Sequence, residues 1–481
     1  MSAFTRRSFF SVAAAAAAVP TAGARGELPW PRPEAAPTRG SDDRGDLAAI
    51  ETLPNVCAHE HWGSLSSVGT AEGGFVADNV AGAASAETGL FDLLFDPYLS
   101  SFLASAGFDS SGLARQHGHL DIVSLAREQP ELVLAEAAPH LANVRSAGAL
   151  TCLTIGVREL YGFDLDALTT RNRHDLDRRL HRHYRNPFAW YREAMAEAHF
   201  VDLIRPVALS FMYEDASPEP AAEERAFTRP ILRIDDFVQA LPQPNSRVRY
   251  CLEKTGLEPH DAESWREFLG RVFTLAGERG NVGIKQLQAY SRDLDFGQGD
   301  EGAIDFAAAD VAGRRPFEDF VVHECCRLAQ EFGWPFQIHI GTANLPDSNP
   351  LPLQRLLRQY PRVRFVLIHG WPFVDEVAWL AHVFPNAYTD TCWLPVLSPS
   401  HLEHALRTYL GYVPAHKLML SHDATSVEMA VGSARLTRRL LRKVLTEQIS
   451  DGRLAPDHAL HLARRALADN AREVYGLGPA R

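Results

Sequence analysis

The chain has 481 residues, of which 46% are hydrophobic and 22% charged, a composition that is ordinary for a globular protein. Its length suits one large α/β domain with insertions, or two domains. The formal net charge of −12 argues against a nucleic-acid-binding protein, because such a protein needs a basic surface to hold phosphate groups.

The first residues have the layout of an export signal. Arg6 and Arg7 precede an apolar, alanine-rich stretch that ends at the small residues Ala22, Gly23 and Ala24. The stretch is shorter than the roughly 20 residues needed to span a bilayer, and the paired arginines resemble a twin-arginine signal. We therefore expect export to the periplasm or the outside of the cell and no membrane span, with a signal peptide at 1–24, a flexible leader at 25–50 and a single domain at 51–481.

The six cysteines do not form a dense disulfide pattern. Cys57, Cys152 and Cys392 lie in strand-like runs, where a buried free thiol is the common state. Even in an oxidising compartment we expect at most one disulfide.

The first half of the chain carries a weak pattern of strands. The fold is expected to start near residues 53–62, and residues 64–130 show no strand period, which indicates a helical insertion after the first strand. A helix is expected at 261–280, ending at a glycine. The strands expected in this half are 149–157, 201–209, 231–238 and 282–290.

The second half is more regular. Apolar strands are expected at 335–340, 363–368, 386–391 and 417–422, alternating with helices, and residues 426–476 are mostly helical. This alternation indicates a parallel sheet covered by helices. About eight strand–helix units fit either a closed (β/α)8 TIM-type barrel or an open doubly wound sheet. The glycine-rich phosphate turn of a dinucleotide-binding open sheet is missing after the first strand, so the barrel is favoured.

Ionisable side chains stand where the expected strands end, and in a barrel these ends converge on the active site. His59 and His61 are two positions apart on the first strand and therefore face the same side. Imidazole is the commonest protein ligand for zinc and similar divalent metals, and a carboxylate can complete the shell. The other residues at strand ends are Lys285, His339, His369 and Asp423.

Each of these residues also has a simpler interpretation. A histidine at a strand end is often a hydrogen-bonded core residue, Lys285 fits a solvated strand end, and Asp423 fits a helix cap. Six residues of metal-binding type at the ends of five strands are much harder to explain in this way. The set as a whole predicts a metal site.

The same residues resemble the amidohydrolase superfamily, which has His-x-His on the first strand, Lys on the fourth, His on the fifth and sixth, and Asp on the eighth. The segments "PFQIHIGT", "VRFVLIHGW" and "HKLMLSHD" are similar to its amidohydrolase 2 branch, and "LQAYSRDL" to the amidohydrolase-like half of fungal FluG-type proteins. The resemblance implies a divalent metal, usually zinc, with His59, His61, His339 and Asp423 as primary ligands. It implies that His369 binds a second metal or the substrate carbonyl, and that Lys285 is carboxylated and bridges two ions or stays unmodified beside one.

The reaction that the resemblance favours is hydrolysis of an amide, lactone or ester bond in a small, carboxylate-bearing substrate, with Asp423 as the general base for a metal-activated water. The alternative enzyme is a non-oxidative decarboxylase or a sugar-acid isomerase. The non-enzymatic alternative is an exported ligand-binding protein whose barrel no longer catalyses a reaction. The partner is a small molecule, and a homo-oligomer stays open. The side chains expected to bind a substrate carboxylate are Arg158, Arg233, Tyr290 and Arg292.

Overall fold

The computed structural model describes residues 47–61, 87–207, 211, 222–308 and 310–478, which all lie in one compact unit. The predicted signal peptide lies outside these residues. The predicted leader ends earlier than expected, because the 3-10 helix η2 (Leu47–Thr52) already buries Leu47 and Ile50. None of the helices in the described part is both long and apolar enough to cross a membrane.

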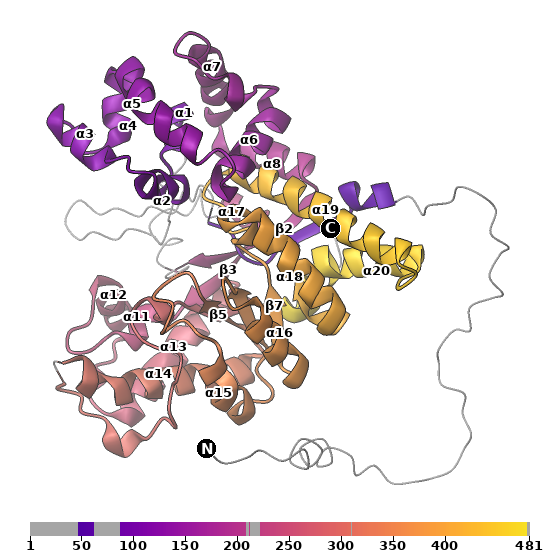
Figure 1. The fold of residues 1–481 in the computed structure, drawn as a ribbon. Helices are drawn as coiled ribbons and strands as arrows, with labels where there is room; N and C mark the ends of the chain where they lie inside the picture. Colours follow the sequence, from indigo (N-terminus) through magenta and orange to yellow (C-terminus); the bar gives the residue numbers. More distant parts are fainter. Residues whose placement is uncertain (1–46, 62–86, 208–210, 212–221, 309, 479–481) are drawn as a thin grey trace, which may run out of the picture. The chain divides into compact units, whose positions relative to one another are not determined.

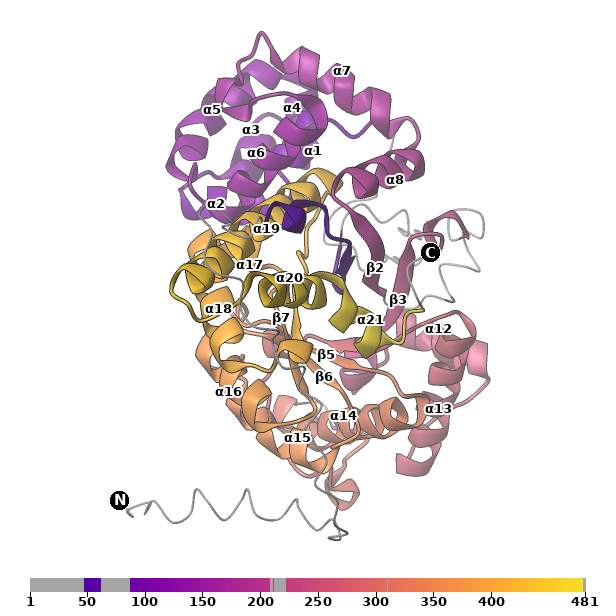
Figure 2. The same ribbon diagram turned by 90° about the vertical axis from the view of Figure 1, so that its right-hand side faces the viewer.

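Eight parallel strands follow one another around a barrel in chain order (Figures 1 and 2). Two backbone hydrogen bonds join the segment after the last strand to the segment after the first, from the His61 amide to the Ala424 carbonyl (3.3 Å) and from the Asp423 amide to the His59 carbonyl (3.1 Å). The (β/α)8 prediction is therefore confirmed. The strands are β1 (Asn55–Cys57), β2 (Phe200–Val207), β3 (Thr228–Arg233), β4 (Ile284–Gln286), β5 (Phe336–Ile340), β6 (Phe365–His369), β7 (Ala387–Asp390) and β8 (Leu418–Met419).

Helices cover the outside of the strands and bury a large apolar layer against them. Their ends follow the local sequence: α14 begins after Asp310, whose carboxylate accepts from the Gly313 amide, and ends at Gly333 with φ +66°. The covering helices are α11 (Asp235–Val238), α12 (Ser246–Thr255), α13 (Ala262–Glu278), α14 (Val311–Phe332), α15 (Gln354–Gln359), α16 (Val374–Val383), α17 (Leu394–Leu397), α18 (Pro399–Tyr412), α19 (Val427–Ser450), α20 (Pro456–Arg464) and α21 (Asn470–Tyr475).

A helical insertion separates β1 from β2 and is longer than predicted, since its helices continue to Glu197. The expected strand at 149–157 is wrong, because these residues belong to a helix that is buried along most of its length. A short apolar run of this kind has no period that separates a buried helix from a buried strand. The insertion consists of α1 (Leu90–Leu94), α2 (Pro97–Ser105), α3 (Ser110–Gln116), α4 (Ile122–Glu128), α5 (Pro130–Asn143), α6 (Gly148–Tyr161), α7 (Arg173–Tyr184) and α8 (Pro187–Glu197).

Two glycines allow helix α6 of the insertion to cross α19 of the barrel at very close range. A Cβ atom at Gly156 would lie 1.7 Å from the Glu428 carbonyl oxygen, and one at Gly432 would lie 1.8 Å from the Cys152 carbonyl oxygen. Only glycine fits at these two positions. The crossing fastens the insertion to the helix that begins just after Asp423.

The inside of the barrel is filled by side chains that alternate along the strands, including Val56, Ile204, Val366 and Ile368. Helix α21 packs on this interior through Ala471, Val474 and Tyr475. The last described helix thus also contributes side chains to the barrel core.

All six cysteines are free and buried, so no disulfide forms. Cys152 lies in α6 rather than in a strand, while Cys57 ends β1 and Cys392 follows β7.

Candidate metal centre

The backbone turns sharply where four neighbouring strands end. Thr342, His369, Trp393 and Asp423 follow or end β5, β6, β7 and β8, and their φ angles are +59°, +71°, +68° and +53°. Residues other than glycine seldom adopt this region, and such strain collects at functional sites because the surrounding structure must hold it. The strand ends of this half of the barrel are therefore built to aim particular side chains.

Four of the predicted ligands meet at the barrel mouth: His59, His61, His369 and Asp423, all less than 6% exposed. The His59 and His61 Nε2 atoms are 3.1 Å apart. The carboxylate of Asp423 lies 3.8 Å from His59 Nε2 and 3.7 Å from His61 Nε2. It also lies 3.5 Å from His369 Nδ1, which donates its hydrogen to the Cys392 carbonyl at 3.1 Å and so leaves His369 Nε2 as the nitrogen with a lone pair. Two donors bound to one zinc ion at the tetrahedral angle lie about 3.4 Å apart. The spacing therefore suits a shared cation.

Burial decides the charge of these imidazoles. It is the largest cause that lowers the pKa of His59, His61 and His369 well below the usual range, and the charge of Lys285 lowers each further. The rings are therefore neutral, which is the form that binds a metal. Burial also raises the pKa of Asp423 to about 7, against the opposing effects of Lys285 and Tyr98.

Lys285 projects from β4 into the same cluster, with its Nζ 3.5 Å from His59 Nε2. Burial, followed by the charge of Arg233, lowers its pKa to about 8. The amine therefore lies beside the predicted ligands and gives up its proton more readily than a solvated lysine does.

His339 is placed differently from the prediction. Its ring contacts that of His369 at a centroid distance of 4.3 Å, but its Nε2 lies 2.9 Å from the Thr342 hydroxyl and 3.1 Å from the Gly341 carbonyl. Within the described part of the chain, His59, His369 and Asp423 form a group whose ligating atoms all lie within 4.8 Å of one another, and His339 is not in that group. In this conformation His339 borders the cluster instead of completing it.

Two residues that the sequence did not single out border the cluster. Tyr98 of helix α2 donates its hydroxyl to Asp423 Oδ1 at 2.8 Å, so the insertion supplies part of the site. The Trp393 ring lies 5.3 Å from that of His369 and 4.8 Å from that of Tyr98, and its buried Nε1 has no hydrogen-bond partner among the described residues. No sequence signal marks Tyr98, since a helix start at Asp96-Pro97 does not say where the next side chain points.

The four predicted substrate-binding side chains are divided by the structure. Arg158 lies on α6, half exposed and paired with Asp164 at 2.9 Å, so its expected position at a strand end is wrong. Arg292 is buried in ion pairs with Glu318 and Asp319.

Arg233 and Tyr290 do lie near the cluster. Arg233 pairs with Asp235 at 2.9 Å, and its charge lowers the pKa of Lys285 and of His61. The half-exposed Tyr290 ring lies 4.9 Å from that of His339. These two remain candidates for contact with a substrate.

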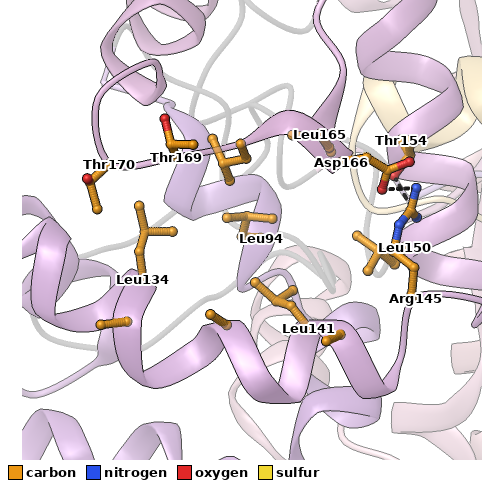
Figure 3. A pocket seen from close by; sticks show the side chains of 14 residues that line it. Leu94, Leu134, Leu141, Arg145, Leu150, Thr154, Leu165, Asp166, Thr169 and Thr170 are labelled. Carbon is orange, nitrogen blue, oxygen red and sulfur yellow. Dashed lines mark hydrogen bonds and ion pairs between the residues drawn. The ribbon is translucent and has the colours of Figure 1, made fainter.

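An apolar cavity of about 540 Å³ lies elsewhere, within the insertion (Figure 3). Leucine and alanine side chains of α5 line it, and Arg145 pairs with Asp166 at one end. It shares no lining residue with the cluster. We therefore place the chemistry at the strand ends, where the ionisable groups are.

The side chains of the cluster fit a divalent metal. They offer neutral imidazole nitrogens and a carboxylate, which suit zinc and similar ions. His59 and His61 bring two nitrogens within 3.1 Å of each other, and such close nitrogens repel each other unless a cation or a proton lies between them. His59, His61, His369 and Asp423 would hold such an ion.

The second half of the chain matches a known protein family. Residues 275–477 match the family model described as "Amidohydrolase", in its amidohydrolase 2 form. Over these residues the chain is similar to the amidohydrolase family. Protein fluG of Emericella nidulans is 30% identical to the chain over 237 residues, which are 44% of the chain and 27% of fluG. The match thus spans only about a quarter of that relative's length.

Solved structures share the fold of this chain at low identity. The uronate isomerase of Thermotoga maritima has a TM-score of 0.69 at 14% identity, covering 89% of this chain and 96% of its own. A proposed metal-dependent hydrolase of Lactobacillus casei has a TM-score of 0.59 at 16% identity, with the same coverage. At these identities the likeness shows the fold alone, and the reaction must be argued from the site.

Proposed function

We propose that this chain is a metal-dependent hydrolase of the amidohydrolase superfamily that cleaves an amide, lactone or ester bond in a small, carboxylate-bearing substrate. The observation that carries the proposal is the convergence of three neutral imidazoles on the Asp423 carboxylate at the barrel mouth, with an atom of each ring 3.5–3.8 Å from a carboxylate oxygen and the His59 and His61 Nε2 atoms 3.1 Å apart. We propose zinc as the metal because the donors are nitrogens and a carboxylate. A divalent cation bound there would lower the pKa of a water molecule from about 15.7 to about 7 and polarise a substrate carbonyl.

Asp423 is the proposed proton carrier. Its carboxylate lies against the imidazoles and the Tyr98 hydroxyl, where it could accept a proton from water and return it to the leaving group. Tyr98 holds Oδ1 by its hydroxyl, so that Oδ2, 3.5 Å from His369 Nδ1, faces the imidazoles. Oδ1 also lies 3.7 Å from His61 Nε2, so both oxygens of the carboxylate border the imidazoles.

The developing negative charge on the substrate oxygen has donors nearby. The Lys285 amine and the Trp393 indole N–H border the cluster, and both are largely buried, where a hydrogen bond to an anion is strong. Arg233 is the proposed partner for the substrate carboxylate. Binding the substrate would weaken the ion pair that Arg233 forms with Asp235.

A sugar-acid isomerase is the second candidate. The Tyr98–Asp423 pair, joined at 2.8 Å, places two proton-handling groups side by side, which suits proton transfer between neighbouring carbons. The uronate isomerase fold of Thermotoga maritima supports this candidate as an architecture only.

The test uses the purified protein loaded with zinc and a panel of carboxylate-bearing amides, lactones, esters and uronic acids. Released acid, amine or alcohol reports hydrolysis, released carbon dioxide reports decarboxylation, and exchange of a carbon-bound proton in D₂O reports isomerisation. We expect hydrolysis by the native chain, its loss in Asp423→Asn, and its retention in the matched control Asp457→Asn, an exposed carboxylate in the first turn of α20. Metal binding without turnover of any substrate in the panel would instead favour a ligand-binding protein.

We also propose that the protein is exported. The proposal rests on the paired arginines at positions 6 and 7 alone. Replacing both by lysine should keep the protein in the cytoplasm, and cell fractionation checks this.

A further inference from the structure

A chain of hydrogen bonds runs from the C-terminal helix to the candidate metal centre. Gln337 of β5 is fully buried beneath His59. Its Nε2 lies 2.6 Å from the Ala58 carbonyl oxygen and 2.6 Å from the Tyr475 hydroxyl, and its Oε1 lies 2.7 Å from His59 Nδ1. Tyr475 is the last residue of α21.

The chemistry of these groups allows only one arrangement of their hydrogens. A backbone carbonyl can only accept, so the amide nitrogen of Gln337 must face Ala58. The amide oxygen then faces His59 and must accept from it. His59 Nδ1 therefore carries the ring proton, and its Nε2 presents a lone pair to the cluster, 3.1 Å from His61 Nε2.

Tyr475 completes the arrangement. Its hydroxyl oxygen accepts the second N–H of the Gln337 amide. Both amide hydrogens are then bonded, and rotating the amide by 180° would break these hydrogen bonds. Burial raises the pKa of the Tyr475 hydroxyl well above its usual value, so the phenol stays neutral. Helix α21 is held by its packing in the barrel interior and ends at Gly476 with φ +64°, which places Tyr475 firmly under the barrel.

We propose that Gln337 and Tyr475 are positioning residues that fix the tautomer and the orientation of His59, and so set the metal affinity of the site. The inference rests on the proposed metal-dependent function, which it deepens by adding a dependence on the C-terminal helix. Groups that hydrogen-bond the second nitrogen of a ligating histidine commonly change metal affinity about 10–100-fold when removed.

Zinc affinity, measured by competition with a chromogenic chelator, tests this proposal in three variants. Gln337→Leu removes the acceptor for His59 and should weaken zinc binding about 10–100-fold. Tyr475→Phe keeps the ring and loses only the hydroxyl, and should weaken binding less than Gln337→Leu does. The matched control is Tyr184→Phe, which removes a buried hydroxyl that bonds to Glu428 at 2.9 Å and not to the cluster, and should leave the affinity unchanged.

A metal-free measurement separates this proposal from the metal-dependent function. Protein labelled with ¹⁵N-histidine reports which ring nitrogen carries the proton, and His59 is assigned by comparison with His59→Asn. We expect Nδ1–H in the native chain and in Tyr184→Phe, and a mixture with Nε2–H in Gln337→Leu.

The outcomes are distinct. A native His59 in the Nε2–H form, or unchanged zinc affinity in Gln337→Leu, would overturn the positioning role. Lower thermal stability with native affinity in Gln337→Leu and Tyr475→Phe would show a purely structural role and would overturn it as well. A native chain that binds no zinc but holds His59 as Nδ1–H would contradict the metal-dependent function and would still support the tautomer assignment.

Discussion

Replacing Gly156 by alanine should separate the insertion from the barrel. The new Cβ would lie 1.7 Å from the Glu428 carbonyl oxygen and 2.7 Å from its carbon, and both are backbone atoms that no side-chain rotation can move away. Helices α6 and α19 would have to move apart by about 1.5 Å to restore ordinary contact. Overpacking of this kind costs about 1–3 kcal/mol and sometimes more, and a backbone clash belongs at the upper end. After the helix-propensity gain of alanine we expect a net loss of about 3 kcal/mol.

Urea unfolding followed by circular dichroism measures this loss, and Gly270→Ala is the control. Gly270 lies inside α13, and nothing lies within 4 Å of the Cβ that alanine would add there. That variant should gain about 0.5–1 kcal/mol, so the same chemical change is expected to have opposite signs at the two positions. Equal stability of Gly156→Ala and Gly270→Ala would refute the reasoning. The clash should also move Tyr98 away from Asp423, so zinc binding in Gly156→Ala is expected to weaken, whereas Gly270→Ala should bind as the native chain does.

Three further predictions follow from the site and its surroundings. Tyr98→Phe should lower turnover more than substrate binding, because it frees the carboxylate that moves the proton, and kcat and KM measured separately check this. Burial raises the pKa of Asp96 to about 6, above the usual 3.8, so its contribution to stability is lost as pH rises through about 6. Asp96→Asn keeps the helix cap and should be more stable than the native chain at pH 8, by up to about 3 kcal/mol, and equal to it near pH 4; a constant difference at all pH values would contradict this. Removal of the metal by a chelator should lower stability by about 4 kcal/mol relative to protein with zinc at 1,000 times its dissociation constant, as thermal melting can show.

The sequence predicts the second half of the barrel well, for a physical reason. Strands β5 to β8 are short apolar runs, and glycine or proline separates them from amphipathic helices. The hydrophobic periodicity and the positions of the helix-breaking residues therefore indicate the same boundaries. The positions of His59, His61, His369 and Asp423 follow from the same pattern, because parallel strands bring their carboxyl ends to one rim.

The secondary structure of the insertion could not be predicted from the sequence in the same way. Helix α6 is apolar on nearly every side because it packs both on the other insertion helices and on α19, so it has no polar face to reveal its period. The wrong strand there also produced the wrong expectation for Arg158. Tyr98 reaches Asp423 across 325 positions in the chain, a contact that only the packing of the insertion determines.

The roles of individual side chains depend on more than the strand pattern. His339 stands at the predicted strand end, yet its Nε2 turns to Thr342, which lies three positions further along the chain. Arg292 also lies where expected, but two nearby carboxylates neutralise it. Local partners, which a one-dimensional pattern does not contain, decide the roles of both residues.

The tight crossing of α6 and α19 also divides the rim of this barrel into a fixed half and a replaceable half. Tyr98 and Asp423 lie on the two sides of that crossing. Redesigning the insertion would therefore also remove the Tyr98 contact with the proposed proton carrier, Asp423. The segments after β4 and β5, which carry Tyr290 and Thr342, do not take part in that crossing. New substrate preferences should therefore be sought by grafting on that side, with the insertion left as it is.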